Sequence, residues 1–309
     1  ESDRETAIDH VREQLRGTPF AEAPIVPTSV VKETGLEEIK KSLAEVLSAT
    51  PPPRDIGKPR LAVDRVFTLR GIGTVVTGTL SGGVFRRGQN VVIQPSGRKT
   101  RLRTLQSHNR DVEASAPGTR TALNLPDVAS HAEQSLEGIR RGDVVTLPEL
   151  GSPSDTLDVI LEKSERLRES KSGGARPIKD GAVVRVHHGS GHFTAHVALV
   201  GGAPLEPGQR TVAQLRAESP VFAFIGDHFI IRDWAEQWTL GGGVILDPDA
   251  TRKQFRGESR RVFLEELAGA LGRPLACVHS VLSRAEAIRR DGLLVKSRFS
   301  VATVSDGRW

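Results

Sequence analysis

Apolar residues in the first fifty positions recur every three or four residues, which is the spacing of one face of a helix. The pattern covers 5–15 and 36–47 and predicts a helix over each range. Between them, the apolar stretch at 23–31 predicts a buried strand that leads into a loop. Three consecutive prolines at 51–53 end the second helix and predict a stiff spacer. This part of the chain is therefore expected to be an α/β unit that ends near residue 54.

From Lys58 onward the pattern changes to an alternation of apolar and polar residues, which is typical of short, half-buried strands. Turns rich in glycine, serine and proline separate these runs. The first group of predicted strands covers 61–67, 73–80, 90–94, 99–106, 120–125 and 143–147. The second group covers 156–161, 183–187, 194–200, 211–215, 221–225, 229–232 and 243–246. Strands of this length and spacing predict two consecutive β-barrels, so that the fold class is mainly β.

Two further segments differ from the barrel pattern. The polar, basic segment at 164–179 is predicted to be an exposed loop. After Pro248 the helical period returns and predicts helices over 258–271 and 274–289, followed by a short strand at 292–295. Helix, helix and strand in this order resemble the front of a winged-helix domain.

Composition sets limits on the class of protein. A chain of 309 residues with 37% hydrophobic and 26% charged residues is globular and long enough for more than one core. No apolar run approaches the length that crosses a bilayer. The single cysteine, Cys277, cannot form an internal disulfide, which indicates a reducing compartment. The net charge of +5 is a weak indication of a polyanionic partner.

Two motifs in the first predicted barrel point to a family. Ala-Val-Asp-Arg-Val-Phe at 62–67 precedes Gly-Ile-Gly-Thr-Val-Val-Thr-Gly-Thr at 71–79. The pair resembles the opening of the second domain of translational GTPases, and 83–89 resembles the next hairpin of the same barrel. These motifs alone do not separate elongation factor Tu, the archaeal initiation factor and their relatives.

Three stretches in the second predicted barrel narrow the resemblance. They are Val-His-His-Gly-Ser at 186–190, Gly-Asp-His-Phe-Ile-Ile-Arg-Asp at 226–233, and the segment with three glycines at 239–248. Together they resemble the third domain of the selenocysteine-specific elongation factor, SelB. The helical pattern that follows lies where bacterial members begin their chain of winged helices, and the resemblance extends over about residues 5–300.

The resemblance implies four parts. We expect a C-terminal remnant of a GTPase domain at 1–53, the two translation-factor barrels at 58–147 and 154–248, and a partial winged-helix domain at 255–309. The sequence contains no Gly-x-x-x-x-Gly-Lys-Ser/Thr, Asp-x-x-Gly or Asn-Lys-x-Asp motif for phosphate and guanine. We therefore expect a fragment that does not hydrolyse GTP.

The family's cofactors are GTP and Mg²⁺, and we expect neither to bind this chain well. Thr-Ser-Val at 28–30 lies where the family has Ser-Ala, a loop whose backbone N–H contacts guanine. Ser29 and Val30 are therefore the candidate nucleotide-binding residues, although Val30 adds bulk where the family has alanine.

Asp64, Arg65 and Arg120 match positions of the family's selenocysteine pocket. A selenol is a stronger acid than a thiol, whose pKa is about 8.5, so selenocysteine is an anion at neutral pH. Arginines attract this anion, whereas a serine hydroxyl leaves their charge uncompensated. Asp64 is expected to hold one arginine in position. The alternative is a salt bridge at the rim of a barrel, which contributes little.

Three groups of residues have weaker functional interpretations. His188, His192 and His196 have metal-ligand spacing for a helix, but the region has β alternation, so we expect histidines on and beside a barrel strand. Cys277 is expected to be a buried thiol. Basic residues that could contact RNA phosphates are Arg166, Arg168, Lys171, Arg176, Arg252 and Lys253. Neighbouring acidic residues make an ordinary solvated surface an equal alternative.

The resemblance implies a cytoplasmic, monomeric factor that delivers selenocysteyl-tRNA to the ribosome, with no membrane partner. It also implies recognition of the selenocysteine-insertion mRNA hairpin through parts that this chain lacks, so 255–309 is expected to act as a connector. Two alternatives remain: another translational GTPase of the elongation factor Tu or initiation factor γ type, and a non-catalytic RNA-binding adaptor with two barrels.

Overall fold

The computed structural model describes residues 2–126, 128, 138–167, 176–284 and 292–305. The chain divides into two compact units, Glu1–Pro52 and Pro53–Trp309. No helix in the described part of the chain is both long and apolar enough to cross a membrane.

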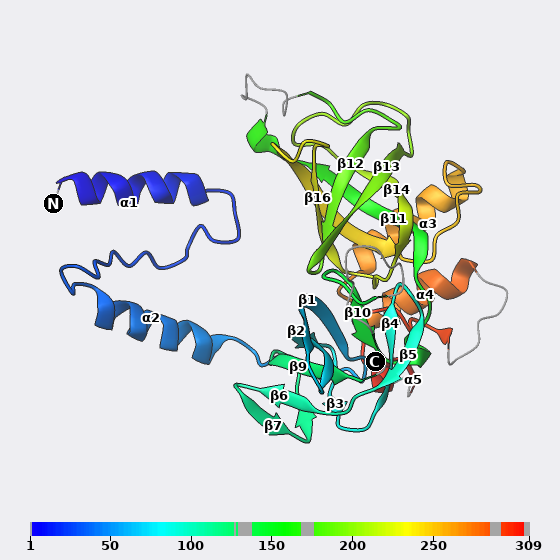
Figure 1. Cartoon of the computed structure of the whole chain (residues 1–309). Helices are drawn as coiled ribbons and strands as arrows, with labels where there is room; N and C mark the ends of the chain where they lie inside the picture. Colours follow the sequence, from blue (N-terminus) through cyan, green and yellow to red (C-terminus); the bar gives the residue numbers. More distant parts are fainter. Residues whose placement is uncertain (1, 127, 129–137, 168–175, 285–291, 306–309) are drawn as a thin grey trace. The chain divides into compact units, whose positions relative to one another are not determined.

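The first unit consists of two helices and an irregular connection (Figure 1). Helix α1 spans Ser2–Leu15 and α2 spans Leu36–Ala49. Gly35 precedes α2 with a φ of 74°, and a Cβ there would lie 2.1 Å from the carbonyl oxygen of Pro27. Glycine is therefore required for the chain to enter this helix.

The buried strand that was expected at 23–31 is wrong. The only strand-like pairing described in this segment is one bridge between Ser29 and Thr34, and Val30 and Val31 are 79% and 94% exposed. A strand needs a neighbour that accepts and donates its backbone hydrogen bonds, and an apolar surface that covers its side chains. The described residues of this unit supply neither, so a β-type composition does not produce a strand.

The first β-domain is an antiparallel sheet of eight strands in the order β5-β4-β10-β1-β2-β9-β6-β7 (Figure 1). Its strands are β1 (Arg60–Leu69), β2 (Gly73–Ser81), β4 (Asn90–Gln94), β5 (Arg98–Arg101), β6 (Leu105–Ser107), β7 (Arg110–Val112), β9 (Arg120–Leu125) and β10 (Val144–Thr146). Two short strands, β3 (Phe85–Arg86) and β8 (Ala114–Ser115), pair separately. Alternation along β1 and β2 directs Leu61, Val63 and Val76 into the core and their neighbours outward.

The second β-domain is a closed barrel of six strands in the order β11-β14-β13-β12-β15-β16, which confirms the mainly β fold. Its strands are β11 (Ser154–Lys163), β12 (Val183–His188), β13 (Gly191–Leu199), β14 (Arg210–Val221), β15 (His228–Arg232) and β16 (Thr239–Asp247). The three consecutive glycines of β16 allow close packing of the barrel wall. A Cβ at Gly243 would lie 1.8 Å from the carbonyl oxygen of Ile160 on β11.

The strand predicted at 221–225 is wrong. Strand β14 ends at Val221, and the next three residues are buried without pairing in the ladder. Phe222 and Phe224 pack in a separate cluster with Leu150 of the 3-10 helix Pro148–Leu150. A continuous apolar run indicates burial, but periodicity alone does not distinguish a buried strand from a buried crossing segment.

The C-terminal segment packs on the second barrel through α3 (Glu258–Ala270) and α4 (Pro274–Arg284), and ends with α5 (Val301–Ser305). Residues 285–289 of the second predicted helix lie outside the described residues. The strand predicted at 292–295 is wrong because these residues form turns. Backbone pairing occurs instead between Ser297 and Ile225, in a single parallel bridge.

The two β-domains meet along a tight seam. Gly142, which follows the loop before β10, lies against Gly191 at the start of β13. A Cβ at Gly191 would lie 2.6 Å from the Cα of Gly142. The Ser190 hydroxyl donates to the Val63 carbonyl at 2.7 Å, and the Arg141 Nε donates to the Ser190 carbonyl at 3.0 Å. The backbones of Gly142 and Gly191 are in direct contact, so this seam fixes the spacing of the two domains.

Candidate functional site

The outer face of the first β-domain carries a compact charged group. The guanidinium of Arg120 on β9 donates to both carboxylate oxygens of Asp64 on β1, with N–O distances of 2.5 and 3.0 Å. Thr77 of β2 lies between them, and its hydroxyl donates to Asp64 Oδ1 at 2.8 Å. The hydrogen bond from Arg120 outweighs desolvation and, with that from Thr77, holds the pKa of Asp64 below its usual value. Asp64 is therefore ionised at neutral pH.

Arg65 belongs to the same face. The β1–β2 register shifts between Val63 and Arg65, because Val63 pairs with Gly78 and Arg65 pairs with Thr77. Asp64 is the extra residue of this bulge. Arg65 is exposed and its charge also lowers the pKa of Asp64, so its guanidinium lies within electrostatic reach of the Asp64–Arg120 pair. The structure thus brings together the three residues that the sequence analysis selected, and their role as a ligand site stays a prediction.

Sequence reasoning missed Thr77. The signal that would have found it is the alternation along β2, which places Thr77 and Thr79 on the outer face between buried neighbours. Of these two threonines, Thr77 is the one whose hydroxyl contacts both Asp64 and Arg120.

Ser29 and Val30 do not form a nucleotide site by themselves. The Ser29 N–H donates to the Thr34 carbonyl at 2.9 Å, and the Val30 side chain is exposed. The sequence contains no glycine-rich phosphate loop to accompany them. The role of Ser29 and Val30 as nucleotide contacts therefore stays a prediction.

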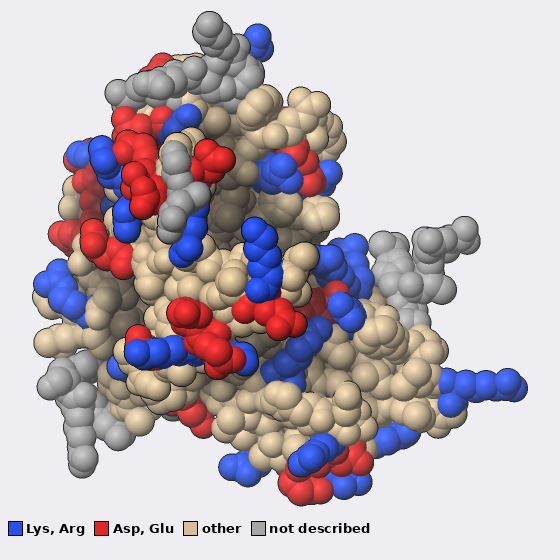
Figure 2. Space-filling view, turned by 90° about the vertical axis from the view of Figure 1, so that its left-hand side faces the viewer, with Lys and Arg blue, Asp and Glu red and all other residues tan. Residues whose placement is uncertain are grey.

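The candidate RNA contacts are dispersed. Arg168 and Lys171 lie outside the described residues. Arg166, Arg176 and Lys253 are exposed, whereas Arg252 forms an ion pair with Asp155 at 3.0 Å. Acidic and basic side chains are interspersed on the face shown in Figure 2. The role of these residues as RNA contacts stays a prediction.

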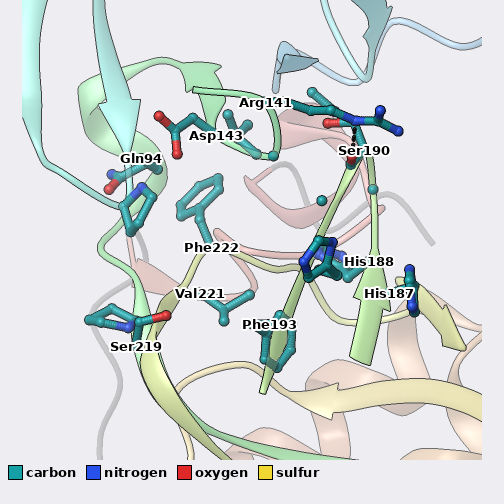
Figure 3. A pocket seen from close by; sticks show the side chains of 18 of the residues that line it. Gln94, Arg141, Asp143, His187, His188, Ser190, Phe193, Ser219, Val221 and Phe222 are labelled. Carbon is teal, nitrogen blue, oxygen red and sulfur yellow. Dashed lines mark hydrogen bonds between the residues drawn. The ribbon is translucent and has the colours of Figure 1, made fainter. Parts of the chain in front are cut away.

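A cavity of about 860 Å³ lies at the seam between the two β-domains (Figure 3). Phe222 projects into it, while Gln94 and Asp143 line the side of the first domain and His187 and His188 line the side of the barrel. Cations and carboxylates both line the cavity, so its charge favours no single class of ligand.

A buried carboxylate holds one end of this seam together. Asp227 of the barrel accepts from both terminal nitrogens of Arg60 on β1, at 2.6 and 3.0 Å, and from His188 Nε2 at 3.1 Å. The guanidinium of Arg60 also stacks on the Phe224 ring, 3.9 Å from its centroid. Burial raises the pKa of Asp227, but the hydrogen bonds and charges of His188 and Arg60 outweigh it and hold this pKa well below the usual range.

His188 and Cys277 both make contacts that stabilise the fold. His188 bonds Asp227, and no group of three or more His, Cys, Asp or Glu in the described ranges is arranged to hold a metal ion. Cys277 is fully buried in α4, and burial raises the pKa of its thiol to about 11.

Comparison with known proteins agrees with this architecture. The family model for the selenocysteine-specific elongation factor β-barrel domain matches residues 165–252. The selenocysteine-specific elongation factor of Desulfomicrobium baculatum is 35% identical over 291 residues, which cover 94% of this chain and 43% of that protein. The factor of the same name from Escherichia coli is 29% identical over 84% of this chain and 37% of that protein.

Other translation factors match less of the chain. Elongation factor 1-alpha-A of Schizosaccharomyces pombe is 31% identical over 65% of this chain. A crystal structure of a bacterial selenocysteine-specific elongation factor, EF-Sec, superposes on 96% of this chain with a TM-score of 0.72 at 22% identity, and so supports the fold.

The chain spans less than half the length of these curated relatives. Its similarity to the factors from D. baculatum and E. coli covers 94% and 84% of its own length. Over most of its own length, this chain is a homologue of the selenocysteine-specific elongation factors.

Proposed function

We propose that this chain carries the tRNA-binding barrels of a selenocysteine-specific elongation factor, which delivers selenocysteyl-tRNA to the ribosome in the cytoplasm in a GTP-dependent reaction. In this proposal 1–53 belongs to the GTPase domain, 58–147 and 154–248 are the two barrels, and 255–309 is a connector related to winged helices. The homology over 94% of the chain supports the assignment of the parts. The observation that carries the selectivity is the group of Asp64, Arg65 and Arg120 on one outer face.

In the proposed mechanism, the site distinguishes selenocysteine from serine by the charge of the side chain. Arg65 and Arg120 supply two positive charges and Asp64 supplies one negative charge, so the group has a net charge of +1. A selenolate brings this total to zero, whereas a serine hydroxyl leaves the positive charge uncompensated. Hydrogen bonds to charged groups contribute roughly 1.5–3 kcal/mol, which corresponds to about 10- to 150-fold in affinity. Selectivity arises because the anion pairs with this charge and its neutral analogue does not.

Equilibrium binding tests the proposal. The protein at its full encoded length, with GTP, is titrated with selenocysteyl-tRNA and with seryl-tRNA that has the same nucleotide sequence. We expect Arg65→Ala to lower the affinity for selenocysteyl-tRNA by about tenfold or more and to leave that for seryl-tRNA nearly unchanged. Arg110→Ala is the matched control because Arg110 is an exposed arginine of β7 in the same sheet. It removes an equal charge elsewhere in the sheet and should leave the ratio of the two affinities unchanged.

Equal loss for both ligands in Arg65→Ala would assign this arginine to general RNA attraction and remove the proposed selectivity. The similarity to elongation factor 1-alpha gives the second candidate, a translational GTPase for other aminoacyl-tRNAs. Equal affinity of the unmodified protein for seryl- and selenocysteyl-tRNA would favour that candidate.

A further inference from the structure

The bulge in β1 places two consecutive side chains on one face of the sheet. In a regular strand, neighbouring side chains point to opposite faces. Here Arg65 pairs in register with Thr77, and Asp64 is hydrogen-bonded to the hydroxyl of the same Thr77. Asp64 and Arg65 therefore both lie on the outer face of the sheet, next to Thr77 of β2. A bulge is a common way to redirect a side chain beside a functional site.

The side chain of Arg120 crosses β2, and Thr77 lies beneath it at this crossing. Arg120 is paired to Thr79 on β2, and β2 separates β9 from β1. To reach Asp64 on β1, the Arg120 side chain must pass over β2. The Thr77 hydroxyl donates to Asp64 Oδ1 at 2.8 Å and receives a longer contact of 3.4 Å from Arg120. One hydroxyl can do both because it has one hydrogen and two lone pairs.

A contact of this kind restricts the geometry of an ion pair that is partly exposed. The Arg120 side chain is 51% exposed and that of Asp64 is 31% exposed. Exposed ion pairs between long side chains lose rotamer entropy when they are held in one arrangement. Thr77 is β-branched and lies within a strand, so its χ1 is restricted and its hydroxyl offers a fixed point.

We propose that Thr77 is a positioning residue that keeps the Asp64 carboxylate on Arg120 and thereby leaves Arg65 as the cation whose charge is available to the ligand. The inference rests on the proposed function. If Asp64 turned to Arg65 instead, the free charge would move to Arg120, and the anion would meet a cation at a different place. The bulge supplies Asp64 and Arg65 side by side, and Thr77 determines which arginine is neutralised.

Two substitutions separate the hydroxyl from the shape of the side chain. Thr77→Val replaces the hydroxyl by a methyl group, and Thr77→Ser restores a hydroxyl. Thr79→Val is the matched control because Thr79 is exposed on the same face of β2. In the full-length protein with GTP, we expect Thr77→Val to weaken selenocysteyl-tRNA binding about tenfold, which is the range for a hydrogen bond to a charged group. Thr77→Ser should bind within about twofold of the unmodified protein, and Thr79→Val should be unchanged.

A second measurement does not depend on tRNA. The pKa of the Asp64 carboxyl, followed by carbon NMR, should rise in Thr77→Val and stay unchanged in Thr79→Val, because the hydroxyl of Thr77 stabilises the ionised form. If Arg65→Ala destroys selectivity while Thr77→Val changes neither binding nor this pKa, Thr77 has no positioning role and the proposed function stands. If Arg65→Ala has no effect on selectivity, the proposed function fails, and an unchanged Asp64 pKa in Thr77→Val would then overturn the inference separately.

Discussion

Replacement of Asp227 by asparagine tests whether one carboxylate holds the two β-domains together. Asp227 accepts four hydrogen bonds: two from Arg60, one from His188 and one from the Phe224 backbone N–H at 2.9 Å. The introduced asparagine would have one acceptor oxygen and would direct an N–H₂ group at other donors. The Arg60 side chain, which is only 19% exposed, would be left without a counter-ion.

The expected cost follows from this burial. Removal of one partner from a buried ion pair costs roughly 3–5 kcal/mol. Because Arg60 retains some contact with water, the lower limit of about 3 kcal/mol applies. A folded unit of this size loses about 2–4 °C in Tm per kcal/mol, so Asp227→Asn should lower Tm by about 6–12 °C. The effect should be present at neutral pH and should vanish in acid. A carboxylate with a lowered pKa stabilises the fold above its unfolded pKa, and that contribution is lost as pH falls through the folded value.

Differential scanning calorimetry of the chain measures this change. Glu113→Gln is the matched control because its ion pair with Arg87 has a similar distance of 3.1 Å, but the side chains are 81% and 53% exposed. That substitution should lower Tm by less than about 2 °C. We also expect the Asp227→Asn transition to broaden or divide as the domains unfold separately. A decrease in Tm no larger than that of the control would show that the seam does not depend on Asp227.

Three further predictions concern the same unit. Lys58 is buried, and burial and the nearby charge of Arg60 lower its pKa to about 8, so the unfolding free energy should rise by up to about 3 kcal/mol between pH 8 and 10.5. This rise should be absent in Lys58→Met when both proteins are followed by urea unfolding across that range. Gly191→Ala should destabilise the chain by about 1–3 kcal/mol because the new Cβ meets backbone, whereas Gly201→Ala, which meets no atom within 4 Å, should not. Cys277 should react with thiol reagents at pH 8 only as fast as the unit unfolds, and reaction as fast as that of free cysteine would contradict its burial.

Local periodicity predicted most of the secondary structure, both in strands with one buried face such as β2 and in the exposed helix α2. The alternation over 73–80 became β2, and the helical spacing over 36–47 became α2. The exceptions are segments whose partners are distant or absent. The stretch at 23–31 has a strand-like composition but no neighbouring strand in the described unit, and 221–225 is buried by packing rather than by pairing. Pairing is a property of the whole sheet, so a short window of sequence does not contain it.

The sequence identified the residues of the candidate site but not how they are arranged. The family resemblance selected Asp64, Arg65 and Arg120, and the structure places them on one face. Sequence alone could not give the bulge, because it is visible only in the register of β1 against β2. Nor could it show that Asp64 is hydrogen-bonded to Arg120, because Arg120 lies on β9, and β2 separates β9 from β1.

The most direct test of the proposed site at Asp64, Arg65 and Arg120 is to measure aminoacyl-tRNA binding as a function of pH. Selenocysteine, cysteine and serine are each attached to the same tRNA through an amide bond, which resists alkaline hydrolysis, and the dissociation constants are measured between about pH 7 and 9.5. The thiol has a pKa of about 8.5, so affinity for the cysteinyl form should rise toward that of the selenocysteyl form across this range, while the seryl form stays weak. Arg65→Ala should abolish the rise. Parallel curves for cysteine and serine would contradict recognition of an ionised head group by this face.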